Sequence, residues 1–249
     1  MANLLEICVD SLASARAAIA GGADRLALCS ALAVGGLTPY AELLQQIRTE
    51  SSIKIRCLIR PRAGDFLYTK EEILLMAAQM EHLKSLGSDG FVIGCLTAEG
   101  ELDGEAMKPL LQAAKGTGLT LHRCIDVSRD PCKTYLDAMA LGIDTVLTSG
   151  AAGSCMLGIE TIGRLLQLRD AHNGPEVLIG GGVKPSVIST FKARFPQACA
   201  FHMSGKKDIE SGMTFRREGV PMGIPGLDEW HIQQTDKQTV QDARLALDT

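Results

Sequence analysis

Several titratable side chains occur within, or directly after, short apolar segments that are typical of buried strands. They are Glu6, Arg60, His122, Asp126 and His202. A carboxylate such as Glu6 or Asp126 is the group expected of a general base, and His122 would serve as the acid or as a donor to an oxyanion. An unpaired charge is costly inside a protein, so a core built for stability alone would hold aliphatic residues instead. We therefore expect a polar site where these segments end.

A second set of residues has the chemistry to hold an anionic group. Arg60 and Arg62 can clamp a carboxylate or a phosphate, and Asp65 follows in the same turn. Hydroxyls and glycines after later strands offer polar groups of the kind found in phosphate-binding loops. These further candidates are Ser149, Gly181, Gly182 and Ser204, together with the imidazole of His202. A Schiff-base aldolase is disfavoured, because no lysine lies at the carboxyl end of a predicted strand.

Cys8 and Cys29 are the candidates for a metal site. They end two successive predicted strands at matched positions, and neighbouring strands run about 4.8 Å apart, so both sulfurs are expected to reach one ion. Soft thiolates suit Cu(I). The sequence contains no C-x-x-C pair, which excludes a closed zinc knuckle and a thioredoxin-type motif. The alternative is that both cysteines only fill core space.

The elements that must position these residues alternate between strand and helix. The predicted strands span 4–8, 25–29, 55–60, 90–96, 119–125, 144–147, 176–179 and 200–203. Helical patterns are predicted at 11–20, 40–48, 68–86, 104–115, 131–141 and 158–171, with a closing helix at 230–247. The segment 213–225 is rich in Gly, Pro and Met, which indicates a long loop.

Three joints between a helix and the next strand share one pattern. Residues 21–26, 86–91 and 141–146 each stop a helix at glycine and enter the strand through aspartate. Eight alternations without a linker predict the α/β class and a single (β/α)8 TIM barrel over residues 1–249. Alternation along the strands, with the more apolar set facing the helices, turns a polar set toward the barrel interior. The inward set includes Glu6, Cys8, Cys29, Arg56, Arg60, His122 and His202.

Composition narrows the class of partner. The net charge of −4 gives no reason to expect nucleic acid or an anionic membrane surface. An apolar run of 18 residues is absent, so a membrane span is not expected. The first residues lack a basic region and a cleavage site, so we expect no secretion signal and a cytoplasmic location with reduced thiols.

Taken together, these motifs resemble the copper homeostasis protein CutC family over nearly the whole chain. The resemblance rests on Leu5-Glu6-Ile7-Cys8, Gly22-Ala23-Asp24-Arg25, Leu28-Cys29, Gly35-Gly36-Leu37-Thr38-Pro39, Ile59-Arg60-Pro61-Arg62, Gly64-Asp65-Phe66, His122-Arg123 with Asp126, Leu147-Thr148-Ser149-Gly150, and His202 with Ser204. It implies a cytoplasmic TIM barrel linked to copper handling, with Cu(I) as the expected metal and often a dimer or higher homo-oligomer.

One position departs from the family pattern. The family usually has Glu-Leu-Cys at the second strand, whereas this chain has Ala27-Leu28-Cys29. An acidic group expected to point inward is therefore missing. This disfavours any mechanism that needs two carboxylates on the first two strands.

The sequence leaves three functions open. The first is copper homeostasis, with Cu(I) bound by the barrel cysteines. The second is an enzyme or a binder for a small anionic ligand, a phosphate or a carboxylate, at the carboxyl-end face of the strands. The third is an interaction scaffold in which loops 30–39 and 213–225 serve an oligomer interface. The alternative to any polar site is a purely structural network, for example Glu6 paired with Arg60.

Overall fold

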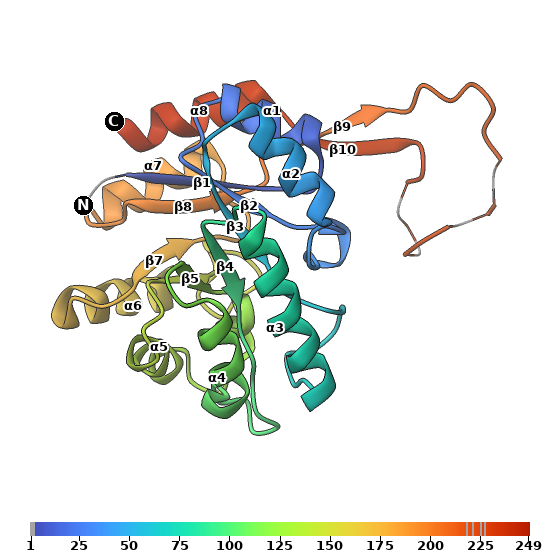
Figure 1. Cartoon of the computed structure of the whole chain (residues 1–249). Helices are drawn as coiled ribbons and strands as arrows, with labels where there is room; N and C mark the ends of the chain where they lie inside the picture. Colours follow the sequence, from blue (N-terminus) through green and yellow to red (C-terminus); the bar gives the residue numbers. More distant parts are fainter. Residues whose placement is uncertain (1–2, 218, 221, 225, 227) are drawn as a thin grey trace.

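The strands of the computed structural model, which describes residues 3–217, 219–220, 222–224, 226 and 228–249, close into a parallel barrel. They follow one another in sequence order around the barrel, and β1 pairs with β8 to close it. This confirms the predicted (β/α)8 architecture (Figure 1). The strands are β1 Leu4–Val9, β2 Arg25–Leu28, β3 Lys54–Leu58, β4 Gly90–Ile93, β5 Gly118–Leu121, β6 Thr145–Thr148, β7 Glu176–Ile179 and β8 Ala200–Met203.

Helices surround the barrel and cover the apolar faces of its strands (Figure 1). They are α1 Leu12–Ala20, α2 Ala41–Glu50, α3 Lys70–Ser85, α4 Gly104–Ala113, α5 Pro131–Ala140, α6 Ile159–His172, α7 Pro185–Arg194 and α8 Lys237–Asp248. Of these, α7 adds a helix to those predicted from the sequence. Strand residues that alternation turns outward, such as Ile7, Cys57 and Phe201, are fully buried beneath this layer.

Two strands end three or more residues earlier than predicted. β4 ends at Ile93 rather than at residue 96, and β5 ends at Leu121 rather than at residue 125. After β5, the His122 ring accepts the backbone N–H of Cys124 and caps a 3-10 turn over Arg123–Val127. A side chain that bonds the local backbone in this way replaces the ladder that a continuing strand would need.

The predicted closing helix at 230–247 is wrong at its start. His231–Thr235 forms strand β10, which pairs antiparallel with β9, Lys206–Glu210. Asp236 then caps α8 by accepting the N–H of Thr239. Figure 1 shows the β9–β10 ribbon projecting away from the barrel. The predicted loop 213–225 lies in this ribbon, and its residues 218, 221 and 225 lie outside the described residues.

The repeated aspartate joints have one structural purpose. The carboxylates of Asp24, Asp89 and Asp144 stand at the amino ends of β2, β4 and β6. Each accepts a backbone N–H from the start of the strand before it: Leu5 at 2.7 Å, Ile55 at 2.9 Å and Leu119 at 2.6 Å. These bonds satisfy donors at the strand starts and so set neighbouring strands in register.

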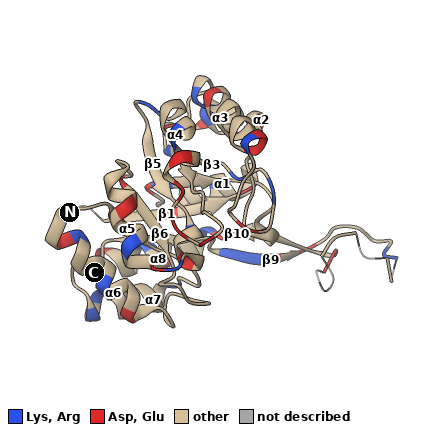
Figure 2. Cartoon of the chain, turned by 90° about the horizontal axis from the view of Figure 1, so that it is seen from below, with Lys and Arg blue, Asp and Glu red and all other residues tan. Residues whose placement is uncertain are grey.

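The outer surface carries charges of both signs. Figure 2 shows acidic and basic residues interspersed over the helices, with basic residues on β9. Within the described part of the chain, no helix combines the length and the apolar character that crossing a bilayer requires.

The contact between Gly90 and Gly118 predicts a site that cannot accept a side chain. A Cβ on Gly90 would lie 2.4 Å from the carbonyl oxygen of Gly118 on the paired strand, whereas a Cβ on Gly104 meets no atom within 4 Å. We expect Gly90→Ala to lower the free energy of unfolding by about 1–3 kcal/mol, as overpacking does. Gly104→Ala, at the start of α4, should be neutral or stabilising by up to about 1 kcal/mol. Urea unfolding of both variants measures this, and equal stabilities would contradict it.

Candidate functional site

A cavity of about 380 Å³ opens among the carboxyl ends of the barrel strands. Its polar wall comes from β1, β2, β3, β5 and β8 or the residues just after them, and the rest is aliphatic or aromatic. The polar and sulfur-bearing lining residues are Cys8, Cys29, Arg60, His122, Arg123 and His202. The aliphatic and aromatic ones include Leu32, Val34, Leu58, Phe66, Val92, Val127 and Leu147. A largely apolar pocket with a few convergent polar groups is typical of a small-molecule site.

Glu6 lies within the barrel and is completely buried. It forms an ion pair with Arg25 of β2, and its Oε1 lies 2.7 Å from Nδ1 of His202 on β8. Burial alone would raise the pKa of Glu6, but Arg25 and His202 outweigh burial and lower this pKa to about 2. The pairing of Glu6 with Arg60 that the sequence suggested is wrong. The strand register instead places Arg25 directly beside Glu6.

His202 links this buried pair to the cavity. Burial lowers the pKa of His202, but charge and hydrogen-bond interactions with the Cys8 sulfur and with the Glu6 carboxylate together raise this pKa to about 10. The ring is therefore protonated near neutral pH, and it shares the Glu6 carboxylate with Arg25. Glu6 itself does not line the cavity, so its carboxylate acts behind His202.

Cys8 and Cys29 both line the cavity, but they are not directly opposite each other. Cys8 pairs with Ala27 on β2, and Cys29 comes two residues later. The sulfurs therefore lie on a diagonal, which corrects the matched positions inferred from the sequence. Cys29 is 3% exposed and its thiol donates to the carbonyl of Val9 at 3.5 Å. Burial, followed by the proximity of Cys8, raises the pKa of Cys29, so this side chain is a thiol at neutral pH.

Arg60 is buried at the end of β3 and ties two loops together. Its Nη1 donates to the carbonyls of Val34 and Gly36 at 2.9 and 3.1 Å, and its Nη2 donates to Gly64 at 2.9 Å. Its Nε is buried without a hydrogen-bond partner in the described chain. Its guanidinium carbon lies 5.2 Å from the centre of the Phe66 ring.

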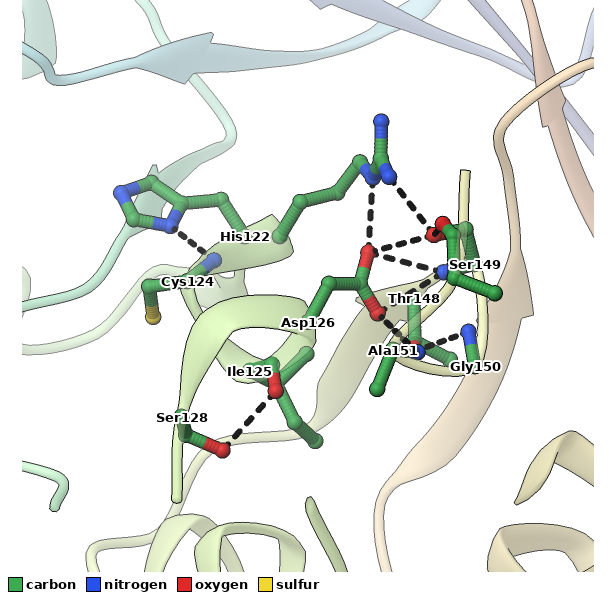
Figure 3. Close-up of polar contacts among 11 residues, drawn as sticks. His122, Cys124, Ile125, Asp126, Ser128, Thr148, Ser149, Gly150 and Ala151 are labelled. Atoms are coloured by element: carbon green, nitrogen blue, oxygen red, sulfur yellow. Dashed lines mark hydrogen bonds and ion pairs between the residues drawn. The ribbon is translucent and has the colours of Figure 1, made fainter. Parts of the chain in front are cut away.

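His122 is neutral and has one free donor. Its Nδ1 accepts the backbone N–H of Cys124 at 3.1 Å, so the neutral ring carries its proton on Nε2 (Figure 3). Burial, with the Arg60 charge adding to it, lowers the pKa of His122 to about 3. Nε2 is buried and has no partner among the described residues. The Phe66 ring lies against this imidazole, with ring centres 4.6 Å apart.

Asp126 does not line the cavity, because its carboxylate is engaged by the β6–α6 loop (Figure 3). Its oxygens accept from the Thr148 hydroxyl at 2.5 Å, from the Ser149 N–H at 2.9 Å and from the Ala151 N–H at 3.1 Å. Arg123 adds an ion pair at 2.7 Å. Ser149 is fully buried within this cluster. The arrangement is that of a carboxylate that organises a loop and holds Arg123 at the cavity wall.

The remaining predicted residues lie outside the cavity. Arg62 pairs with Asp65 at 3.0 Å and with Glu72 at 2.6 Å on the outer side of the β3–α3 loop. Gly181 and Gly182 have left-handed backbones and approach Ser149 and Ser154, respectively. Ser204 lines a separate pocket beside β10. Arg56 points to the amino end of the barrel, where it pairs with Asp144 at 2.7 Å.

Comparison with known proteins shows which family the chain belongs to. The family model described as "CutC family" matches residues 3–206. The chain belongs to the CutC family. It is 40% identical to a CutC family protein of Chromobacterium violaceum, with 100% of this chain and 99% of that protein covered. It is 37% identical to the human "Copper homeostasis protein cutC homolog", with 96% of this chain and 86% of that protein covered.

A solved CutC structure, from Streptococcus agalactiae, shares the architecture. It is 29% identical, has a TM-score of 0.75, and covers 81% of this chain and 98% of its own. The CutC family model ends at residue 206, the first residue of β9. Most of the β9–β10 ribbon of this CutC family member therefore lies beyond the matched region.

Three residues at the cavity of this CutC family member, or directly behind it, escaped the sequence-based list. Arg25 could have been found, because alternation with the outward Leu26 turns it inward. Arg123 follows His122 directly, but its place on the wall depends on the 3-10 turn after β5. Phe66 lies in a loop, where no periodicity applies, and only the folded course of that loop brings it against His122.

Removing Arg25 would leave the Glu6 carboxylate buried without its closest counter-charge. We expect Arg25→Met to lower the free energy of unfolding by about 3–5 kcal/mol, as breaking a buried ion pair does. Arg16→Met, which breaks the exposed pair of Arg16 with Glu50, is the matched control and should change little. Chemical denaturation measures both values, and a similar effect of the two substitutions would refute the role assigned to Arg25.

The lowered pKa of His122 predicts a pH dependence of stability. Below pH 6.5 the unfolded chain protonates this ring, whereas the folded ring stays neutral down to about pH 3. The unfolded state then binds more protons, so stability falls as the pH falls through this window. Relative to His122→Gln, the wild-type protein should lose about 1.4 kcal/mol for each pH unit. Urea unfolding across this range tests it, and parallel stability curves would exclude a neutral buried His122.

Proposed function

We propose that this protein acts in copper homeostasis by binding Cu(I) between the sulfurs of Cys8 and Cys29. The observation that carries the proposal is that both thiols, from adjacent strands, line one cavity at the carboxyl end of the barrel. The human relative is named a copper homeostasis protein, which supports the same role for this chain.

The donor set suits Cu(I) better than other metals. Thiolates are soft ligands that suit both Cu(I) and Zn²⁺, but Zn²⁺ takes four protein ligands in structural sites, and three protein ligands with a water in catalytic ones. Among the described residues, no group of three or more His, Cys, Asp or Glu side chains is placed to hold a metal ion. Two sulfurs alone fit the low coordination numbers of Cu(I). Binding would displace the thiol proton of Cys29, while the protonated His202 beside Cys8 compensates negative charge on the sulfurs.

We also propose a cytoplasmic homodimer or higher homo-oligomer. All eight cysteines are free, as expected of a reducing compartment. The β9–β10 ribbon carries exposed apolar side chains, and exposed apolar patches on soluble proteins mark interaction surfaces. They include Met213, Phe215, Met222 and Ile232. These side chains support self-association through the ribbon.

Anaerobic Cu(I) titration against a colorimetric chelator tests the metal site. We expect Cys8→Ser and Cys29→Ser each to weaken binding by more than about a hundredfold, because losing one of two ligands exceeds the 10–100-fold effect of outer-shell changes. Cys132→Ser is the matched control, since Cys132 is half-buried on α5 and does not line the cavity. Wild-type affinity in both cavity variants, or equal loss in the control, would eliminate the site.

A further inference from the structure

Arg60 is a buried cation whose charge no described acidic side chain neutralises. The residue is 8% exposed, and its hydrogen bonds go to backbone carbonyls of Val34, Gly36 and Gly64. Its Nε–H has no partner within the described chain. The other cations on the cavity wall differ in this respect, because His202 faces Glu6 and Arg123 faces Asp126. A buried charge without a counter-charge is strongly unfavourable, so this site calls for an anion.

His122 presents a second donor without an acceptor. The residue is 5% exposed, and its Nδ1 is already used as the acceptor for Cys124. The neutral ring therefore carries its proton on Nε2, and this N–H has no acceptor in the described chain. A buried donor that makes no hydrogen bond costs free energy. A hydrogen-bond acceptor supplied by a ligand would satisfy it.

The two donors belong to one site. Phe66 lines the cavity and contacts both side chains, with its ring 4.6 Å from the His122 ring and 5.2 Å from the Arg60 guanidinium carbon. Both donor atoms are buried beneath the present packing. For a ligand to reach them, the half-buried Phe66, which lies in the loop between β3 and α3, would have to rotate.

We propose that the cavity binds a small carboxylic acid as its monoanion, with the carboxylate oxygens accepting hydrogen bonds from Arg60 Nε and His122 Nε2. This binding goes beyond the proposed copper function, because it uses β3 and β5 rather than the cysteines of β1 and β2.

A carboxylate fits this site better than a phosphate. Arg60, a wall cation that contacts no described carboxylate, and the neutral donor of His122 match a single negative charge, whereas a phosphate monoester is close to doubly charged at neutral pH. The glycines after β7, which phosphate-binding barrels use, do not line the cavity. Much of the remaining wall is aliphatic, at Leu32, Leu58, Val92 and Leu147. The ligand's body is therefore apolar.

Calorimetric titration with sodium butyrate tests the proposal, with butyramide and inorganic phosphate as comparison probes. The wild-type protein should bind butyrate, and butyramide and phosphate should bind at least about tenfold more weakly, the equivalent of one charge-assisted hydrogen bond. His122→Leu should lose about tenfold in butyrate affinity, and His122→Gln, which restores an N–H donor at the same reach, should recover part of it. Arg60→Met should abolish binding.

Other outcomes overturn the proposal. Absence of butyrate binding, equal affinity for butyramide, or preference for phosphate each refutes a carboxylate site. Wild-type affinity in His122→Leu does the same, and this variant decides the matter if Arg60→Met fails to fold because Arg60 also ties two loops. Arg16→Gln, which removes an exposed cation on α1, controls for the change in net charge and should bind as the wild type does.

Discussion

The buried contact of Glu6 with Arg25 and His202 is the interaction on which the barrel interior depends. β1 lies between β8 and β2, and Glu6 draws one partner from each. A carboxylate with no exposure to water is tolerable only when its charge and its lone pairs are met. The first strand is therefore joined to its two neighbours by side chains as well as by the backbone ladder, at the seam where the barrel closes.

Polar groups inside the barrel fall into levels that differ in how completely they are satisfied. At the amino end, Arg56 meets Asp144 and the hydroxyls of Thr120 and Thr145. In the middle, the Glu6 carboxylate contacts both Arg25 and His202. At the carboxyl end, the Asp126 carboxylate accepts hydrogen bonds from the segment Thr148–Ala151, whereas Arg60 and His122 each have a donor without a partner in the described chain. The buried donors of Arg60 and His122, which both line the cavity and have no hydrogen-bond partner in the described chain, are the physical basis for proposing a function there.

The two proposed ligands would use different parts of this wall. The thiols lie on β1 and β2, and the free donors follow β3 and β5. His202 places a positively charged ring beside the Cys8 sulfur, and Arg60 places a positively charged guanidinium on the part of the wall that carries the free donors. A cavity with this division can hold a soft metal ion and a small anion without the two competing for the same atoms. The departure at Ala27 agrees with this arrangement, because a carboxylate there would neutralise the cations that face the cavity.

The sequence by itself determined the barrel, its strand order and the inward set of side chains, because strand alternation, glycine stops and aspartate joints are local patterns. Only the tertiary structure decided the partners. Glu6 pairs with Arg25 rather than Arg60, and the two cysteines lie on a diagonal, because register depends on how distant strands align. Asp126 is consumed by the Thr148–Ala151 loop, Phe66 covers His122, and residues 231–235 form a strand with β9. Each of these outcomes rests on contacts between segments far apart in the chain, which no local periodicity encodes.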